Sequence, residues 1–117
     1  MTELQHVFGD HYLVELIGCD SEVIKNVEGV KESFFQAAQE AEATVLNSAF
    51  HQFEPVGVTG FLLLAESHFF LHTWPQERYV AFDIFTCGPM FPERAIERLT
   101  EDFKASRVKT QVIKRGY

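Results

Sequence analysis

The fold of this chain is best predicted from one central stretch, Val58-Thr59-Gly60-Phe61-Leu62-Leu63-Leu64-Ala65-Glu66-Ser67-His68-Phe69-Phe70-Leu71-His72-Thr73-Trp74-Pro75. Its first half, Val58 to Ala65, is a continuous apolar run of the length expected for a buried strand. A further strand is predicted over about His68 to Trp74. Polar groups inside this apolar stretch each need a hydrogen-bond partner, because a buried group without one costs roughly 1–3 kcal/mol. The glutamate, serine and two histidines grouped here therefore suggest a functional site.

The segments on either side of this stretch predict the remaining elements. Strands are expected over His11–Ile17, from Thr44 to about Phe53, over Tyr79–Phe85 and from Ser106 to Ile113. The recurrence of apolar residues predicts a main helix from about Val30 to Ala43, after a short lead-in that Gly29 separates from it. Asp20 or Ser21 is expected to cap that lead-in. Pro92 suits the first turn of a second helix, which carries Ala95, Ile96, Leu99 and Phe103 on one face.

The order of these elements is strand, helix, several strands, helix, strand. It favours an α+β fold, a two-layer sandwich in which a mainly antiparallel sheet carries both helices on one face. The other face of the sheet must then be polar or be covered, and a symmetric dimer is one way to cover it.

Composition narrows the class of protein. A chain of 117 residues fits one domain, residues 1–117, and 46% hydrophobic residues indicate a folded chain. The formal net charge of −7 argues against nucleic acid or an anionic membrane surface as the main partner. The opening Met1–His6 shows no secretory signal, so Cys19 and Cys87 are expected to be free thiols in the cytoplasm. The longest strongly apolar stretch is far shorter than the roughly 20 residues that span a bilayer.

Two common kinds of site fit the central stretch poorly. His68 and His72 lie four residues apart, which on a strand separates them by roughly 13 Å, too far for one metal ion. No metal is therefore expected. Ser67 lacks the Gly-x-Ser-x-Gly elbow of the serine hydrolases. From pattern alone, Ser67 would be a serine at a strand end, His72 a half-buried histidine and Cys87 a small buried residue.

Four motifs that occur in order change this interpretation. They are Gly57-Val58-Thr59-Gly60, Ala65-Glu66-Ser67-His68, His72-Thr73-Trp74-Pro75 and Phe85-Thr86-Cys87-Gly88. Together they closely resemble the short prokaryotic S-adenosylmethionine decarboxylase proenzymes, which depend on a pyruvoyl group. The resemblance runs from about residue 9 to about residue 113. Each motif alone is weak, but four in order at the family's spacing are highly specific.

The resemblance implies a chain that cleaves itself. Ser67 Oγ would attack the carbonyl of Glu66, the amide would become an ester, and β-elimination would divide the chain into residues 1–66 and 67–117. Ser67 would become an N-terminal pyruvoyl group with loss of ammonia. By the same match, His72 is the base of processing, since an imidazole exchanges protons near neutral pH. Thr59 supplies a supporting hydroxyl at a position where the family typically has serine.

For turnover, the resemblance implies that the pyruvoyl ketone forms a Schiff base with the substrate's α-amine and accepts electrons as CO₂ leaves. Cys87 matches the family's proton donor, and a free thiol is largely protonated at neutral pH. Phe53 and Trp74 are candidates for stacking on adenine or facing the sulfonium. Where the family usually has a glutamate that binds the ribose hydroxyls, this chain has Gln76, followed by Glu77.

That departure leaves the substrate open. An amide can bond to a hydroxyl, but without the strength of a charged acceptor, so either Glu77 takes over or nucleoside binding is altered. S-adenosylmethionine is the first candidate, as the source of aminopropyl groups for spermidine. Arginine or ornithine is the second, because relatives of the family decarboxylate them with the same pyruvoyl machinery. A third possibility is a catalytically inactive relative that regulates an active one, although the presence of Ser67, His72 and Cys87 together argues against it.

Overall fold

Six strands, two helices and one short 3₁₀ turn make up the structure, a computed structural model that describes residues 3–117. Met1 and Thr2, which begin the expected 1–66 fragment, lie outside the described residues. The elements in chain order are β1 (Val7–Ile17), α1 (Val27–Glu40), β2 (Val45–Gln52), β3 (Val58–Leu64), β4 (Ser67–Trp74), η1 (Pro75–Glu77), β5 (Tyr79–Thr86), α2 (Pro92–Asp102) and β6 (Arg107–Gly116).

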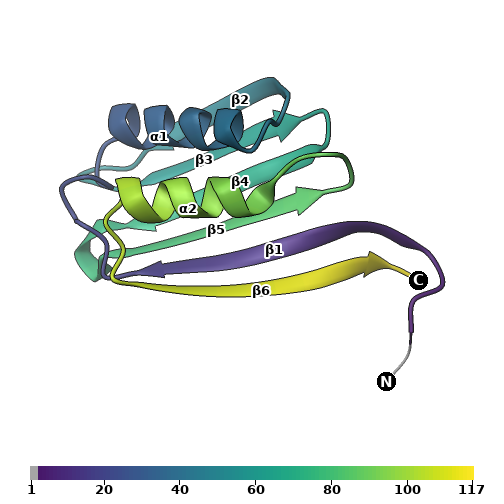
Figure 1. Cartoon of the computed structure of the whole chain (residues 1–117). Coiled ribbons are helices and arrows are strands. Elements are labelled where there is room, and N and C mark those ends of the chain that lie inside the picture. The colour runs from purple at the N-terminus through teal and green to yellow at the C-terminus, as the bar shows by residue number, and fades with distance from the viewer. Residues whose placement is uncertain (1–2) are drawn as a thin grey trace.

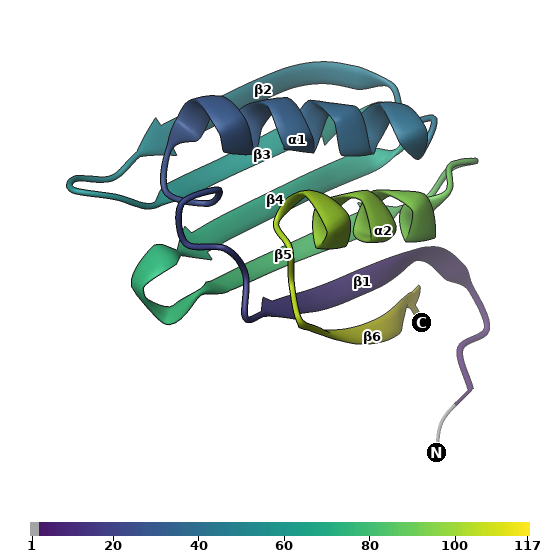
Figure 2. The ribbon, with the colours of Figure 1, turned by 60° about the vertical axis from the view of Figure 1, so that its left-hand side comes forward.

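The strands form one sheet in the order β2-β3-β4-β5-β1-β6, and every pairing of neighbours among the described residues is antiparallel. Both helices lie on the same face of this sheet (Figure 1). Helix α1 contacts β2 and β3, and α2 contacts β1, so the helices run side by side above the strands (Figure 2). The predicted α+β two-layer sandwich with an antiparallel sheet is therefore confirmed.

Alternation along the strands builds the core between the sheet and the helices. In β4, Phe69 and Leu71 are fully buried, whereas Phe70 between them is exposed. Phe34 of α1 meets Phe69 at 5.7 Å between ring centroids and is itself fully buried. Truncating a fully buried phenylalanine of this kind to alanine typically costs about 3–5 kcal/mol.

The start of the first helix differs from the prediction. Helix α1 begins at Val27, so Gly29 lies inside its first turn and does not divide it. The reason is tertiary, because Gln52 at the end of β2 accepts a hydrogen bond from the Val27 N–H at 2.7 Å. Asp20 instead accepts from the Glu22 N–H at 2.9 Å within the preceding loop. The helix ends at Glu40, before the predicted Ala43.

The two strands at the chain ends are longer than predicted. Strand β1 begins at Val7 and β6 ends at Gly116, because the two strands pair with each other along almost their whole length. The register between β1 and β6 shifts near Gly9, which interrupts the alternation of apolar and polar residues from which a strand is predicted. A side chain at Gly9 would lie 2.5 Å from the Thr86 carbonyl oxygen, so this position has no room for one.

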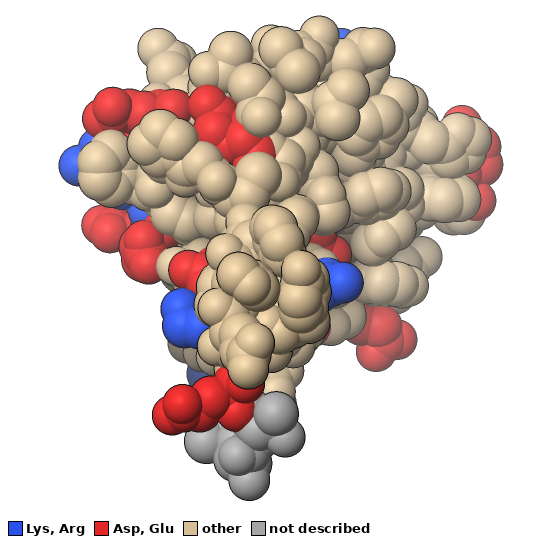
Figure 3. Space-filling view, turned by 90° about the vertical axis from the view of Figure 1, so that its right-hand side faces the viewer, with Lys and Arg blue, Asp and Glu red and all other residues tan. Residues whose placement is uncertain are grey.

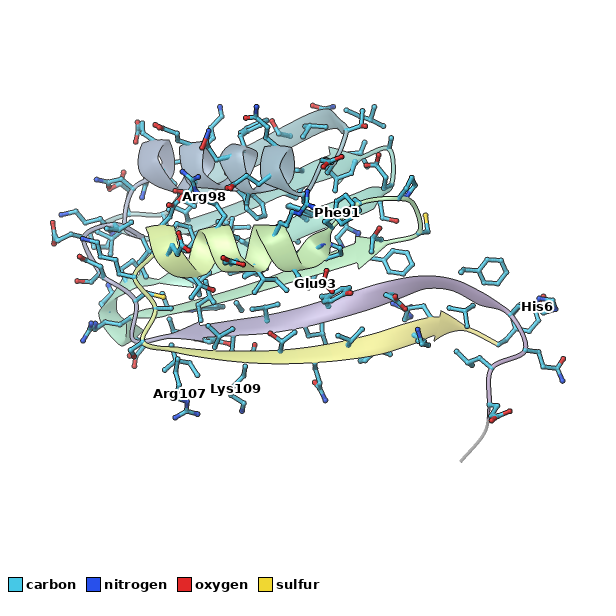
Figure 4. The ribbon with its side chains drawn as sticks, in the orientation of Figure 1. His6, Phe91, Glu93, Arg98, Arg107 and Lys109 are labelled. Carbon is cyan, nitrogen blue, oxygen red and sulfur yellow. The ribbon has the colours of Figure 1, made fainter. Side chains whose placement is uncertain are left out.

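Polar contacts connect the helices to each other and to β1. Arg98 lies between the two helices (Figure 4) and contacts both Glu40 of α1 and Asp102 of α2 at 3.0 Å. The Tyr12 hydroxyl of β1 donates to Glu93 of α2 at 2.9 Å. Burial, together with that carboxylate, raises the pKa of Tyr12 to about 12. Within residues 3–117, neither helix is long and apolar enough to cross a membrane.

The face of the sheet away from the helices has no layer over it within the described residues. Arg107 and Lys109 of β6 point away from the helices on this side (Figure 4). Strand β4 presents four side chains with rings to this open face, at alternating positions: His68, Phe70, His72 and Trp74. Strand β3 adds two large apolar side chains, Phe61 and Leu63. We call these six residues the open-face patch. Exposed apolar residues gathered in this way are typical of an interaction surface.

Candidate active site

The two-residue turn between β3 and β4 presents the predicted cleavage point. Ala65 and Glu66 form this turn, and Ser67 begins β4 with a φ of 149°, a region that residues with a side chain rarely adopt. Such a backbone conformation costs of the order of 1–3 kcal/mol and is typical of functional sites. Ser67 Oγ lies 3.4 Å from Cys87 Sγ, so the structure brings the predicted pyruvoyl precursor and proton donor together.

The carbonyl oxygen of Glu66 is held by two donors from one residue. It accepts a hydrogen bond from the Cys87 N–H at 2.9 Å and another from the Cys87 thiol at 3.3 Å. When a nucleophile attacks a carbonyl, negative charge develops on its oxygen, and donors already in place stabilise that charge. The arrangement therefore suits attack on the Glu66–Ser67 peptide bond by the adjacent hydroxyl.

Neighbouring loops hold this turn from two sides. The Glu66 carboxylate accepts from the Thr44 N–H at 3.0 Å, and the Ala65 N–H donates to the Thr44 carbonyl at 2.9 Å. On the other side, Gly88 packs so closely that an added Cβ would lie 2.9 Å from Glu66 Cγ. The sequence did not indicate Thr44 or the role of the Glu66 side chain, because both contacts depend on loops that meet only after folding.

The opposite end of β4 forms a second cluster. The Thr59 hydroxyl of β3 lies 2.9 Å from His72 Nδ1, as expected for neighbours in the β3–β4 register. Both residues line a cavity of about 440 Å³ together with Phe53, Trp74 and Gln76. The cavity combines aromatic rings with a few polar groups, which is typical of a site for a small organic ligand. The structure thus gathers Thr59, His72 and three of the four predicted substrate contacts.

The fourth predicted contact, Glu77, is not among the residues that line this cavity. It shares the short turn η1 with Gln76, but only Gln76 reaches the cavity. The sequence did not indicate Tyr79, whose ring stacks on Trp74 at 5.3 Å and whose hydroxyl donates to Glu15 at 3.0 Å. Its place opposite Trp74 in the β4–β5 register could have been found only by aligning the two strands.

The two clusters lie at opposite ends of one strand. Ser67 is the first residue of β4 and His72 is five positions further along. Because a strand rises about 3.3 Å per residue, the two residues are about 16 Å apart on the same chain. A base must come within about 3 Å of the proton that it removes. His72 therefore cannot act on Ser67 of its own chain in this arrangement.

A third group of polar residues lies on the open face. His68 and His11 approach the same oxygen of Asp83, at 3.0 Å and 3.5 Å from their Nε2 atoms, and the three could hold a metal ion. However, Arg115 lies 3.1 Å from His11 Nδ1, and a guanidinium there opposes a second cation. We interpret the group as a cluster of polar contacts around Asp83. The spacing of His68 and His72, on which the sequence-based expectation of no metal rests, does not involve His11 or Asp83.

Comparisons with known proteins agree with this geometry. The family model described as S-adenosylmethionine decarboxylase matches residues 10–116. The chain is 43% identical to the S-adenosylmethionine decarboxylase proenzyme of Thermococcus kodakarensis over 117 residues, which cover 99% of this chain and 81% of that protein. It is 44% identical to the proenzyme of Caldicellulosiruptor saccharolyticus over 112 residues, 95% of this chain and 90% of the relative.

A solved structure extends the likeness from sequence to fold. The adenosylmethionine decarboxylase from Aquifex aeolicus superimposes with a TM-score of 0.88 at 37% identity, covering 95% of this chain and 92% of that one. The resemblance that the four motifs predicted is thereby confirmed. The chain belongs to the S-adenosylmethionine decarboxylase family, whose members are carboxy-lyases.

Proposed function

We propose that this protein cleaves itself between Glu66 and Ser67 and then decarboxylates S-adenosylmethionine with a pyruvoyl group made from Ser67. The products of cleavage would be residues 1–66 and 67–117. The observation that carries the proposal is the Glu66 carbonyl, which has two donors from Cys87 in place and the Ser67 hydroxyl next to it. The family membership of the chain supports the same reaction.

Cleavage follows from bonds that these residues can form. Ser67 Oγ attacks the Glu66 carbonyl carbon through a five-membered ring, the C–N bond breaks, and the hydroxyl proton passes to the freed amine. A base then removes the α-proton of Ser67, and the Cβ–Oγ bond breaks with its electron pair leaving on oxygen. Glu66 departs as a carboxylate, and water replaces ammonia at the remaining dehydroalanine. No external oxidant is needed.

The pyruvoyl group, when formed, supplies the electron sink that decarboxylation requires. The residues of the chain bind, orient and move protons around it. Cys87, whose thiol touches Ser67 Oγ, is placed to return a proton to the substrate α-carbon. Phe53 and Trp74 offer aromatic faces that attract adenine or a sulfonium cation. Gln76 lines the same cavity and can bond to the ribose hydroxyls.

The site is completed, in our proposal, by a second copy of the chain. Because Ser67 and His72 lie about 16 Å apart along one strand, a base for Ser67 must come from elsewhere. A two-fold axis that runs between two sheets and across their strands would set the Ser67 end of one β4 against the His72 end of the other. The open-face patch would then be buried between two sheets, with the helices outside.

Mixing two inactive variants tests this assembly. Ser67→Ala keeps His72 but has no hydroxyl to attack, whereas His72→Ala keeps Ser67 but lacks the base. We expect each variant alone to stay intact by denaturing mass spectrometry. When the two are unfolded together and refolded, half of the dimers would be mixed, and only the His72→Ala chain in them would be cleaved. Decarboxylation should recover to about a quarter of the wild-type rate, since each mixed dimer has one complete site of two.

The masses identify which chain is cut, so the result has one interpretation. If neither chain is cleaved in the mixture while wild-type chains refolded in the same way are cleaved, His72 does not act across an interface. If wild-type protein remains one intact chain after long incubation, the self-cleavage proposal itself is wrong. Ser33→Ala, a change in helix α1 at a residue that belongs to neither cluster, serves as the matched control and should leave cleavage unchanged.

The substrate is tested by measuring CO₂ release from S-adenosylmethionine, arginine and ornithine side by side. A cavity of about 440 Å³ with aromatic walls fits an adenosyl group better than a small basic amino acid. Release from S-adenosylmethionine by the purified chain alone would also exclude an inactive regulatory relative. A cytoplasmic location and the absence of nucleic-acid partners stay predictions.

A further inference from the structure

The turn that carries the cleavage point has one feature that the proposed reaction does not use. Two oxygen atoms lie against the sulfur of Cys87: the Glu66 carbonyl oxygen at 3.3 Å and Ser67 Oγ at 3.4 Å. In the cleavage reaction described above, the acyl group of Glu66 moves onto Ser67 Oγ and then leaves together with that atom. Both oxygens that contact the thiol therefore become the two oxygens of one new carboxylate, at the end of the 1–66 fragment.

We propose that this new α-carboxylate of Glu66 is a second functional group made by cleavage, which holds Cys87 in its protonated form as the proton donor. The inference rests on the proposed self-cleavage. A carboxylate accepts a stronger hydrogen bond from the thiol than the neutral carbonyl does. Removing the thiol proton would also place two negative charges side by side, which disfavours the thiolate. Glu66 is a positioning residue in this scheme, because it acts through Cys87.

The carboxylate stays in place only if the new chain end is held, and three contacts hold it. The Cys87 N–H donates to the Glu66 carbonyl oxygen at 2.9 Å, a bond that a carboxylate would strengthen. The Glu66 side chain accepts from the Thr44 N–H at 3.0 Å. Gly88 lies so close to Glu66 that a Cβ added there would be 2.9 Å from Glu66 Cγ, so the two residues are near neighbours. None of these contacts depends on the bond that is cut.

The charged groups that line the groove beside Cys87 in one copy of the chain do not oppose a protonated thiol. The groove beside the thiol is also lined by Asp10, Tyr12, Glu93 and Lys114. Lys114 lies 3.2 Å from Asp10, and the Tyr12 hydroxyl donates to Glu93, so the one cation in the groove is already paired. Basic side chains occupy only a small part of this end of the molecule (Figure 3). Among the groups that line this groove in one copy of the chain, within residues 3–117, no unpaired cation favours the thiolate.

The protonation of the Cys87 thiol can be followed directly, because the thiol of Cys19 does not react under the same conditions. Cys19 is fully buried, and burial raises the pKa of its thiol to about 11. Alkylation with iodoacetamide between about pH 7 and 10 therefore reports Cys87, the exposed cysteine. We compare cleaved wild-type protein with uncleaved Ser67→Ala. We expect the midpoint of the pH profile of the cleaved form to lie about one unit higher, so that it reacts about tenfold more slowly near pH 7, below both midpoints. Thiolate absorbance in the ultraviolet gives the same midpoint without a reagent.

A third sample separates the carboxylate from the ketone. Borohydride reduces the pyruvoyl carbonyl to an alcohol and leaves the Glu66 carboxylate intact, so the slow alkylation should persist. Alkylation that returns to the rate of Ser67→Ala after reduction would assign the effect to the ketone and overturn the inference. Equal midpoints in cleaved and uncleaved protein would overturn it as well. If mass spectrometry finds no cleavage in the wild type, the proposed function fails first.

Discussion

The two ends of strand β4 differ in almost every physical respect. At its start, Ser67 has a positive φ and lies against an exposed thiol on a tight turn. At its end, His72 and Trp74 line a cavity with aromatic walls. The first end has reactive groups but little to hold a substrate, and the second has a binding cavity but no atom to form the cofactor. In our proposal, these ends are two half-sites of one active site, and function depends on a second copy of the chain that joins them.

The largest effect on cleavage is expected from a substitution that prevents two copies of the chain from associating, because the proposed active site needs both. Phe70 lies midway between the two ends, 36% exposed on the open face, and Phe70→Asp would bury a charge at the proposed interface. We expect a folded monomer, by light scattering and circular dichroism, in which cleavage is slowed at least about a hundredfold.

Val108→Asp is the matched control for this prediction. Val108 is 39% exposed but lies on the helix side of the sheet, in the groove beside α2. It should leave the dimer and the cleavage rate unchanged. A Phe70→Asp monomer that cleaves itself at the normal rate would show that one chain has a complete site for processing.

A smaller effect on the cleavage rate is expected from a substitution beside His72. Thr59→Val keeps the shape of the side chain but removes the hydroxyl that lies 2.9 Å from His72 Nδ1. Losing one hydrogen bond of about 1 kcal/mol should slow cleavage about five- to tenfold. The measurement is the time course of intact chain by mass spectrometry. Thr59→Ser keeps the hydroxyl and should cleave at close to the normal rate, and a rate as slow as that of Thr59→Val would argue against this role.

Substrate affinity should depend on the cavity at the His72 end of β4 and not on the Ser67 end. Gln76→Glu introduces a charged acceptor for the ribose hydroxyls, and we expect KM for S-adenosylmethionine to fall about threefold to tenfold with kcat little changed. Glu77→Gln alters a residue that does not line the cavity and should leave KM as it is. A large rise in KM on Glu77→Gln would instead assign ribose binding to Glu77.

The smallest effect concerns stability near the Ser67 end. Tyr12→Phe removes the bond from the hydroxyl to Glu93 and should lower the free energy of unfolding by about 0.5–1 kcal/mol near neutral pH. The pKa of Tyr12 is raised to about 12, so the unfolded chain loses its hydroxyl proton first as pH rises from about 10. The advantage of wild type over the variant should therefore shrink between about pH 10 and 12. Urea unfolding of both proteins at pH 8 to 11 checks this, and a constant difference would contradict it.

Much of the fold was predictable because its signals are local. The apolar run before Ala65 and the alternation in β5 follow from which residues can be buried on one side of a strand, and Pro92 marks the start of α2. The start of α1 was not predictable. Its first free N–H is satisfied by Gln52, a residue 25 positions further along the chain. The ends of β1 and β6 likewise depend on their pairing with each other.

The predicted chemistry of this protein follows from residue types and their order alone: a serine after a glutamate, a thiol and an imidazole at the spacing of one family. These are properties of residue types and order, which do not depend on distance. Which of these groups come into contact depends on how the strands pair in the folded chain. Antiparallel pairing of β4 and β5 sets Ser67 opposite Thr86, next to Cys87, while the rise along β4 carries His72 about 16 Å away. Contact is a property of distance in space, and a strand both brings its neighbours together and keeps its own two ends apart.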